Sequence, residues 1–171
     1  MNPISSLVFV LLLTVFPTLI LCQTPLIIQA CNYTIYKFQC LDTLQPDPEA
    51  HSATTLKTLV KVTIKHSETK ASDIDNQIIK LIRSTNDAGL KTVLNGCSDN
   101  YLTVVEKIQA AGVSLADNNY YNVKEWINEA TTNIVYCNRA FQGKPFKSPI
   151  SDSATLLSQL CTNALSILPH V

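Results

Sequence analysis

The sequence predicts an all-α protein, an antiparallel up-down four-helix bundle with an N-terminal helical hairpin extension. Three observations support this prediction. Apolar residues recur in steps of three and four along four segments, which is the spacing of one buried helix face. The connections between these segments are short, so neighbouring helices are expected to run antiparallel. The 171 residues include only four glycines, and no lasting alternation of the kind that marks β-strands is found.

The first 22 residues differ from the rest of the chain. "ISSLVFVLLLTVFPTLILC" is an almost unbroken apolar run without a charged side chain. We interpret residues 1–22 as a secretory signal peptide that is removed after Cys22, which leaves one domain, residues 23–171. An uncleaved membrane anchor is the alternative, because about 19 apolar residues can span a bilayer. The first interpretation predicts a secreted protein with no membrane contact once the signal is removed.

Residues 23–47 are predicted to form the N-terminal hairpin. They contain Cys31 and Cys40, and they are too few to bury a core of their own. Asp47-Pro48 is the expected start of the first bundle helix, because proline is favoured in the first turn of a helix. The tripeptide Asn32-Tyr33-Thr34 makes Asn32 a candidate for N-glycosylation.

Residues 48–171 are predicted to hold the four helices of the bundle. Their apolar stripes run over residues 56–82, 90–115, 123–141 and 157–168. "TNDAG" interrupts the pattern after the first helix, and "QGKPFKSPISDS" after the third. Asp117 or Asn118 is the expected N-cap of the third helix, and Ser151 or Asp152 that of the fourth.

Two cysteines lie on the apolar stripes of neighbouring helices. Cys97 and Cys137 stand at similar distances from the turn near Asn118, so a disulfide between their helices is geometrically reasonable. Cys31 then has Cys40 as its near partner. Four cysteines nevertheless allow three pairings, and spacing alone does not choose between them.

Cys161 is the fifth cysteine of the domain. Secreted proteins meet an oxidising environment, and an odd number of cysteines leaves one free thiol or one that pairs between chains. Cys161 follows Leu160 on an apolar face, so we expect a buried and unreactive thiol rather than a nucleophile.

Charge and motifs argue against several classes of function. Lysine plus arginine and aspartate plus glutamate number 13 each, so no basic excess favours a nucleic acid partner. The histidines His51, His66 and His170 are scattered, and no Cys-x-x-Cys pair occurs, so no metal site is expected. No Gly-x-Ser-x-Gly or glycine-rich phosphate loop is found. We therefore expect a protein with no catalytic residues and no cofactor, which is not an enzyme.

Four segments together resemble the plant invertase and pectin methylesterase inhibitor family. They are "CNYTIYKFQCLDTL", "LNGCSDNYLTVV", "VKEWINEATTNIVYCNRAF" and "LCTNALSIL", and their order covers nearly the whole domain. The resemblance implies the same bundle and hairpin, and disulfides that join Cys31 to Cys40 and Cys97 to Cys137. It also implies secretion to the plant cell wall, the apoplast, and inhibition of an enzyme by direct contact, here as a monomer.

The resemblance leaves two target enzymes. Invertase inhibitors of the family commonly carry Pro-Lys-Phe ahead of the fourth cysteine, where this chain has Tyr120-Tyr121-Asn122. "DNNYY" is more similar to pectin methylesterase inhibitors, so pectin methylesterase is the expected partner. A cell-wall or vacuolar invertase is the alternative, and a non-inhibitory, allergen-like binding module is a third possibility.

The expected contact residues are Tyr120 and Tyr121, because tyrosine is favoured at protein interfaces. Ordinary packing at a helix start is the alternative for both. Lys57, Lys61 and Lys65 form a stripe at i, i+4 spacing, which is a solvated helix face or a patch for an acidic enzyme or pectin.

Overall fold

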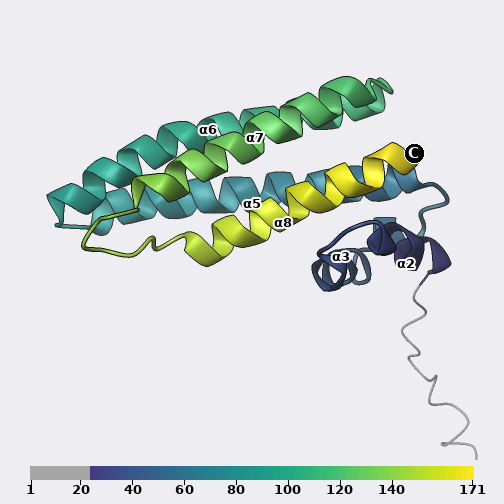
Figure 1. Cartoon of the computed structure of the whole chain (residues 1–171), viewed down its shortest axis with the longest axis horizontal. Coiled ribbons are helices and arrows are strands. Elements are labelled where there is room, and N and C mark those ends of the chain that lie inside the picture. Colours follow the sequence, from purple (N-terminus) through teal and green to yellow (C-terminus); the bar gives the residue numbers. More distant parts are fainter. Residues whose placement is uncertain (1–23) are drawn as a thin grey trace, which may run out of the picture.

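The computed structural model describes residues 24–171, so the predicted signal peptide lies outside the described residues. All regular structure in residues 24–171 is helical. The α-helices are α2 (Pro25–Asn32), α3 (Lys37–Leu44), α4 (Pro48–His51), α5 (Leu56–Ser84), α6 (Ala88–Ala116), α7 (Tyr120–Ala140) and α8 (Ser151–Ile167), followed by the 3-10 turn η1 (Leu168–His170). The predicted fold class is confirmed, because α5 to α8 form the antiparallel bundle and α2 and α3 lie beside one end of it (Figure 1). No helix in the described part is long and apolar enough to cross a membrane.

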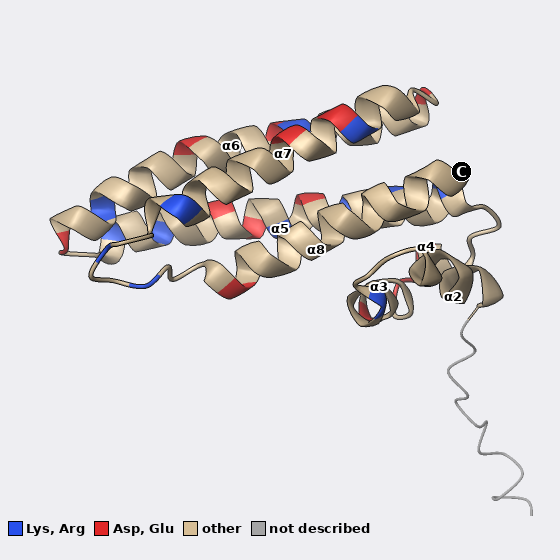
Figure 2. Ribbon diagram, in the orientation of Figure 1, with Lys and Arg blue, Asp and Glu red and all other residues tan. Residues whose placement is uncertain are grey.

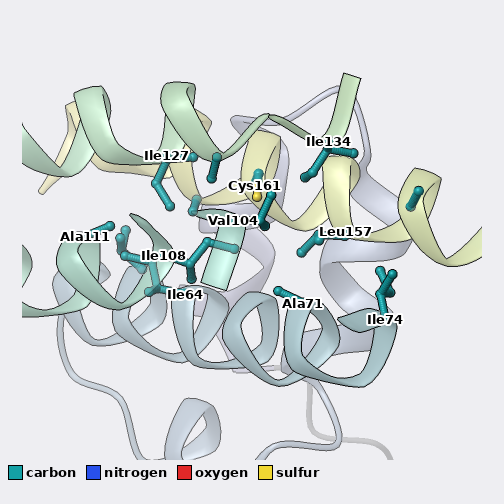
Figure 3. Close-up of a cluster of buried hydrophobic side chains, with 14 of the residues drawn as sticks. Ile64, Ala71, Ile74, Val104, Ile108, Ala111, Ile127, Ile134, Leu157 and Cys161 are labelled. Carbon is teal, nitrogen blue, oxygen red and sulfur yellow. The ribbon is translucent and has the colours of Figure 1, made fainter. Parts of the chain in front are cut away.

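The core lies along the shared axis of the four long helices (Figure 3). Its members are mostly isoleucine, leucine, valine and alanine, and most of them belong to the predicted stripes, although Ile150 and Ala154 lie outside these stripes. They include Ile64, Ala71 and Ile74 of α5, Val104, Ile108 and Ala111 of α6, Ile127 and Ile134 of α7, and Leu157 and Cys161 of α8. Burial of these faces supplies the stability that the many β-branched residues do not supply through helix propensity.

The start of the first bundle helix differs from the prediction. Asp47 and Pro48 begin the separate short helix α4, and α5 begins only at Leu56. Each start has its own cap: the Asp47 carboxylate accepts hydrogen bonds from two backbone N–H groups, and the Thr55 hydroxyl accepts one from Thr58. Two capping residues eight positions apart therefore start two helices, which the proline signal alone did not reveal.

The caps of the last two helices also differ from the prediction. Asn119, not Asp117 or Asn118, caps α7 by accepting from the Asn122 N–H at 3.1 Å. At α8 no side chain forms a cap: Ser151 and Asp152 are already helical, and the preceding Ile150 is buried in the core.

The hairpin is attached to the end of the bundle at which α8 finishes. Thr34 donates a buried hydrogen bond of 2.6 Å to the side-chain oxygen of Asn163. The rings of Tyr33 and His170 are stacked, with centroids 3.6 Å apart. Ile27 and Leu44 are fully buried, so the hairpin shares the core of the bundle.

Candidate functional site

Two disulfides link the described cysteines. Cys31 pairs with Cys40 inside the hairpin, with a Cα–Cα distance of 5.5 Å, and Cys97 pairs with Cys137 between α6 and α7, with 4.8 Å. These are the pairs expected from the sequence. The second bridge closes a separation of 40 residues and fastens α6 to α7 far from the turn that connects them. Both helices are therefore fixed to each other at two places.

Among residues 24–171, Cys161 is the one cysteine outside a disulfide, and it is fully buried. Burial raises the pKa of its thiol to about 12, although hydrogen bonds with the Thr131 and Ser67 hydroxyls oppose that rise. A thiol with this pKa stays protonated at ordinary pH, and only the thiolate is a nucleophile. Cys161 thus serves as a core residue.

The described residues offer no metal-binding cluster. Within residues 24–171, no three side chains from His, Cys, Asp and Glu come together in a way that could hold a metal ion.

Several hydrogen bonds fix the conformation of the turn between α6 and α7. Asn118 has a positive φ of 57°, a conformation that asparagine tolerates better than most residues. The N–H groups of Asn118 and Asn119 donate to the carbonyls of Leu115 and Ser114, which is the Schellman pattern of a helix C-terminus. Asn119 then caps α7. Three residues therefore end one helix and start the next.

Lys57 fastens this turn to α5. Its ammonium group donates to the side-chain oxygen of Asn118 at 2.7 Å and to the carbonyl of Ala116 at 3.4 Å. The last turn of α6 has no basic residue of its own. Lys57 therefore supplies, from another helix, the positive charge that the C-terminus of a helix favours.

The two candidate tyrosines follow directly. Tyr120 is half-buried, and its hydroxyl donates to the side chain of Asn118 at 3.3 Å. Tyr121 points outward with 72% of its surface exposed, and Val113, one turn before the end of α6, is 65% exposed. The structure thus separates the pair: Tyr120 packs at the helix start, whereas Tyr121 is available for a partner.

A small hollow lies between α5 and α6 beside this turn. It has a volume of about 160 Å³ and is lined by Lys57, Thr58, Lys61, Gly112, Leu115 and Ala116. Its floor is apolar and its rim carries two lysines. Together with Tyr121 and Val113 it makes this end of the bundle the best candidate for a contact surface, and we call it the turn end.

The lysine stripe on α5 has less net positive charge around it than the sequence alone indicates. Lys61 forms an ion pair of 2.7 Å with Glu49, and Lys65 lies 3.7 Å from the same carboxylate. The hydrogen bond from Lys61 lowers the pKa of Glu49. The short helix α4, which the sequence did not predict, therefore places one negative charge beside two of the three lysines.

Other exposed groups were not predicted from the sequence. Ile35 and Phe38 at the tip of the hairpin are each 83% exposed, although their spacing suits a buried face. Asn32, in the proposed sequon, is exposed at the end of α2, whereas its partner Thr34 is buried. Between α6 and α7, the ammonium of Lys107 lies 4.7 Å from the ring centroid of Trp126 and 3.3 Å from Glu129.

The sequence matches a known family and several named proteins. The profile described as "Plant invertase/pectin methylesterase inhibitor" matches residues 25–167. A pectinesterase inhibitor of Actinidia deliciosa is 27% identical, and the match covers 95% of this chain and 92% of that protein. A "Cell wall / vacuolar inhibitor of fructosidase 2" of Arabidopsis thaliana is 32% identical, with 68% of each chain covered.

A further relative is much longer than this chain. The "Putative pectinesterase/pectinesterase inhibitor 26" of Arabidopsis thaliana is 26% identical over 82% of this chain, which spans only 16% of that protein. Solved structures agree on the fold. A pectin methylesterase inhibitor from Arabidopsis thaliana, at 18% identity, has a TM-score of 0.66 and covers 85% of this chain. A mutant form of such an inhibitor from Arabidopsis, at 19% identity, has a TM-score of 0.72 and covers 82%.

Proposed function

This chain belongs to the plant invertase/pectin methylesterase inhibitor family, and on that basis we propose that it is a secreted inhibitor of pectin methylesterase in the plant cell wall. The observation that carries the proposal is the match with the Actinidia inhibitor over nearly the full length of both chains. Tyr120-Tyr121-Asn122 supports the same target, because it stands where invertase inhibitors commonly have Pro-Lys-Phe.

The mechanism we propose is coverage of the active-site cleft by the turn end. Tyr121 and Val113 are exposed apolar groups that can enter the cleft, and the hollow beside Lys57 can receive a side chain of the enzyme. The disulfide between α6 and α7 and the hydrogen bonds around Asn118 hold this surface before binding. A surface that is already ordered loses little conformational entropy when it docks, so affinity is gained.

Invertase is the second candidate target. The Arabidopsis fructosidase inhibitor is 32% identical to this chain and the Actinidia pectinesterase inhibitor 27%, although the match with the fructosidase inhibitor covers less of this chain. For binding to invertase, other contacts of the turn end would have to replace those of the Pro-Lys-Phe tripeptide, which this chain lacks at residues 120–122.

The first test is a side-by-side titration. The chain from residue 23 onward, refolded with its disulfides, is added to plant pectin methylesterase and to cell-wall invertase at mildly acidic pH. We expect loss of esterase activity alone. Loss of invertase activity alone would assign the chain to the second target, and no loss of either activity would contradict the inhibitor function.

The second test probes the contact surface. Tyr121→Ala is expected to weaken inhibition about tenfold or more, since exposed tyrosines at interfaces are frequent hot spots. Tyr136→Ala is the matched control, because Tyr136 is also exposed, at 56%, and lies near the opposite end of α7. Equal inhibition by both variants would remove Tyr121 from the interface.

The extracellular location and the modification of Asn32 belong to the same proposal. The exposed Asn32 side chain leaves room for a glycan at the hairpin. Expression in plant cells should yield a secreted protein that starts at Gln23. Its mass should include a glycan that is absent from the Asn32→Gln variant. An unmodified wild-type protein would refute the glycosylation site alone.

A further inference from the structure

Charge is unevenly distributed along the bundle, although the formal net charge of the chain is zero. One end of the bundle consists of the last turns of α5 and α7, the first turns of α6 and α8, and the connections between them, residues 80–91 and 139–152. We call it the basic end. It holds six of the 13 basic and two of the 13 acidic residues: Lys80, Arg83, Lys91, Arg139, Lys144 and Lys147, with Asp87 and Asp152. Figure 2 shows these basic segments together at the end of the bundle that is remote from the hairpin.

The positive charge of the basic end is available to a ligand. All six basic side chains are exposed, and within residues 24–171 none of them takes part in an ion pair. One of the two acidic groups there, Asp87, is engaged in capping α6 through the Leu90 N–H. At the other end of the bundle, by contrast, Lys61 and Lys65 share the carboxylate of Glu49, at 2.7 and 3.7 Å.

The connection that carries two of the lysines is held against the helices. Phe146 packs edge-on against Phe141, with ring centroids 6.2 Å apart, and lies close to Gly89 at the start of α6. Gln77 of α5 donates to the carbonyl of Pro149 at 3.3 Å. Lys144 and Lys147, which flank Phe146, are therefore kept beside the ends of α5 and α6, where Lys80, Arg83 and Lys91 lie.

This composition suits a flexible polyanion better than a folded protein. Lysine is depleted in protein–protein interfaces, whose affinity depends on buried apolar and aromatic anchors. Within residues 80–91 and 139–152 no large apolar side chain is exposed, since Phe141 and Ile150 are buried and Phe146 is half-buried. Dispersed exposed cations without an anchor attract a charged polymer mainly through electrostatics and the release of counterions.

We propose that the basic end binds the carboxylate groups of de-esterified pectin. The choice of this polymer rests on the proposed function. Pectin methylesterase uses water to convert each neutral methyl ester into a carboxylate and methanol, so its product is a polyanion whereas its fully esterified substrate is uncharged. The basic end lies at the opposite end of the bundle from the turn between α6 and α7 (Figures 1 and 2), so binding of pectin there leaves the turn end free. The inhibitor would thereby be retained where the enzyme has already acted.

The test is a binding experiment without enzyme. The chain from residue 23 onward is applied to immobilised polygalacturonate and to highly methyl-esterified pectin at low and at physiological ionic strength. We expect binding to polygalacturonate only, and weaker binding as salt rises. The triple variant Lys80→Gln, Lys144→Gln and Lys147→Gln should bind at least about tenfold more weakly, because the charge at the basic end is nearly removed.

The matched control is Lys37→Gln, Lys65→Gln and Lys124→Gln. It changes three exposed lysines and the same net charge, but on α3, near the middle of α5 and at the start of α7. The control should bind polygalacturonate like the wild type. Equal loss in both triple variants, or no binding at low ionic strength, would overturn the proposal.

The same variants separate this inference from the proposed function. If the first triple variant lost binding to pectin methylesterase while polygalacturonate binding was unchanged, the basic end would be a protein contact and the proposal would be wrong. A wild-type chain that binds polygalacturonate but inhibits neither enzyme would retain the basic-end site and refute the inhibitor function.

Discussion

At the scale of single residues, one layer of the bundle core contains hydroxyl groups and a thiol. Each long helix contributes one member: Ser67, Tyr101, Thr131 and Cys161, from α5, α6, α7 and α8 in turn. The hydroxyls of Ser67 and Thr131 donate to the carbonyls of Thr63 and Ile127 in their own helices. The buried hydroxyl of Tyr101 finds no hydrogen-bond partner. Ser67 and Thr131 therefore have hydrogen-bond partners in this layer, whereas Tyr101 has none.

We predict that Tyr101→Phe will stabilise the protein. A buried polar group without a partner carries a desolvation cost, and phenylalanine keeps the ring while removing the hydroxyl. The free energy of unfolding should rise by about 1 kcal/mol, measured by urea denaturation. Tyr136→Phe serves as the control, because that hydroxyl belongs to an exposed side chain and its loss should change nothing. A loss of stability in Tyr101→Phe would show that the hydroxyl has a partner in solution.

At the scale of elements, the short helix α4 acts as a clamp between the hairpin and the bundle. One oxygen of Asp47 accepts from the backbone of Glu49 and Ala50, and the other lies 2.9 Å from Nε2 of His66 on α5. Partial burial by itself would raise the pKa of Asp47, but these hydrogen bonds outweigh it, and the pKa lies below its ordinary value of 3.8. Folding thus favours the ionised carboxylate.

The clamp makes a pH-dependent contribution to stability. Because the pKa is lower in the folded state, the contribution is complete above the ordinary value of 3.8 and disappears as the pH falls through the lower folded value. Asp47→Ala should cost about 1 kcal/mol of unfolding free energy at pH 5, and the difference from wild type should shrink towards pH 2. Asp73→Ala, an exposed change on α5, is the control. A difference that stays constant with pH would show that the charge of Asp47 plays no part.

The same scale shows what the sequence could and could not predict. The four long helices were predictable because each must bury one apolar stripe, and that stripe repeats visibly over many turns. Helix α4 is too short to show a period, so only its caps could have revealed it. The anchoring of the α6–α7 turn by Lys57 depends on a side chain 61 residues distant from Asn118, and no local pattern contains that contact.

At the scale of the whole molecule, the candidate site was predictable only in outline. The similarity of "DNNYY" to inhibitors pointed to the residues that form the turn end, yet two adjacent tyrosines could not be told apart from the sequence. Their difference follows from helix geometry, because consecutive residues on a helix point about 100° apart and only Tyr121 faces solvent. The basic end was invisible for a related reason: its six charges come from three separate helices and one connection, and they cancel in the net charge of zero.

The two disulfides should contribute differently to the molecule as a whole. On the chain-entropy model, the bridge across 40 residues between Cys97 and Cys137 stabilises by about 4 kcal/mol, and the bridge across nine residues between Cys31 and Cys40 by about 3 kcal/mol. Replacing both Cys97 and Cys137 with serine should therefore lower the urea midpoint of the entire bundle. Replacing both Cys31 and Cys40 should mainly speed amide exchange in α2 and α3.

Measuring inhibition without the Cys97–Cys137 disulfide separates its effect on the rigidity of the turn end from its effect on the stability of the fold. If the α6–α7 bridge preorganises the turn end, its removal should weaken inhibition even at temperatures where the variant remains fully folded, because the surface must then be ordered on binding. Dissociation should be faster, whereas association should change little. Inhibition that is unchanged in a folded variant without the Cys97–Cys137 bridge would mean that Lys57 and the Schellman turn hold the surface on their own, and that the disulfide serves only the fold.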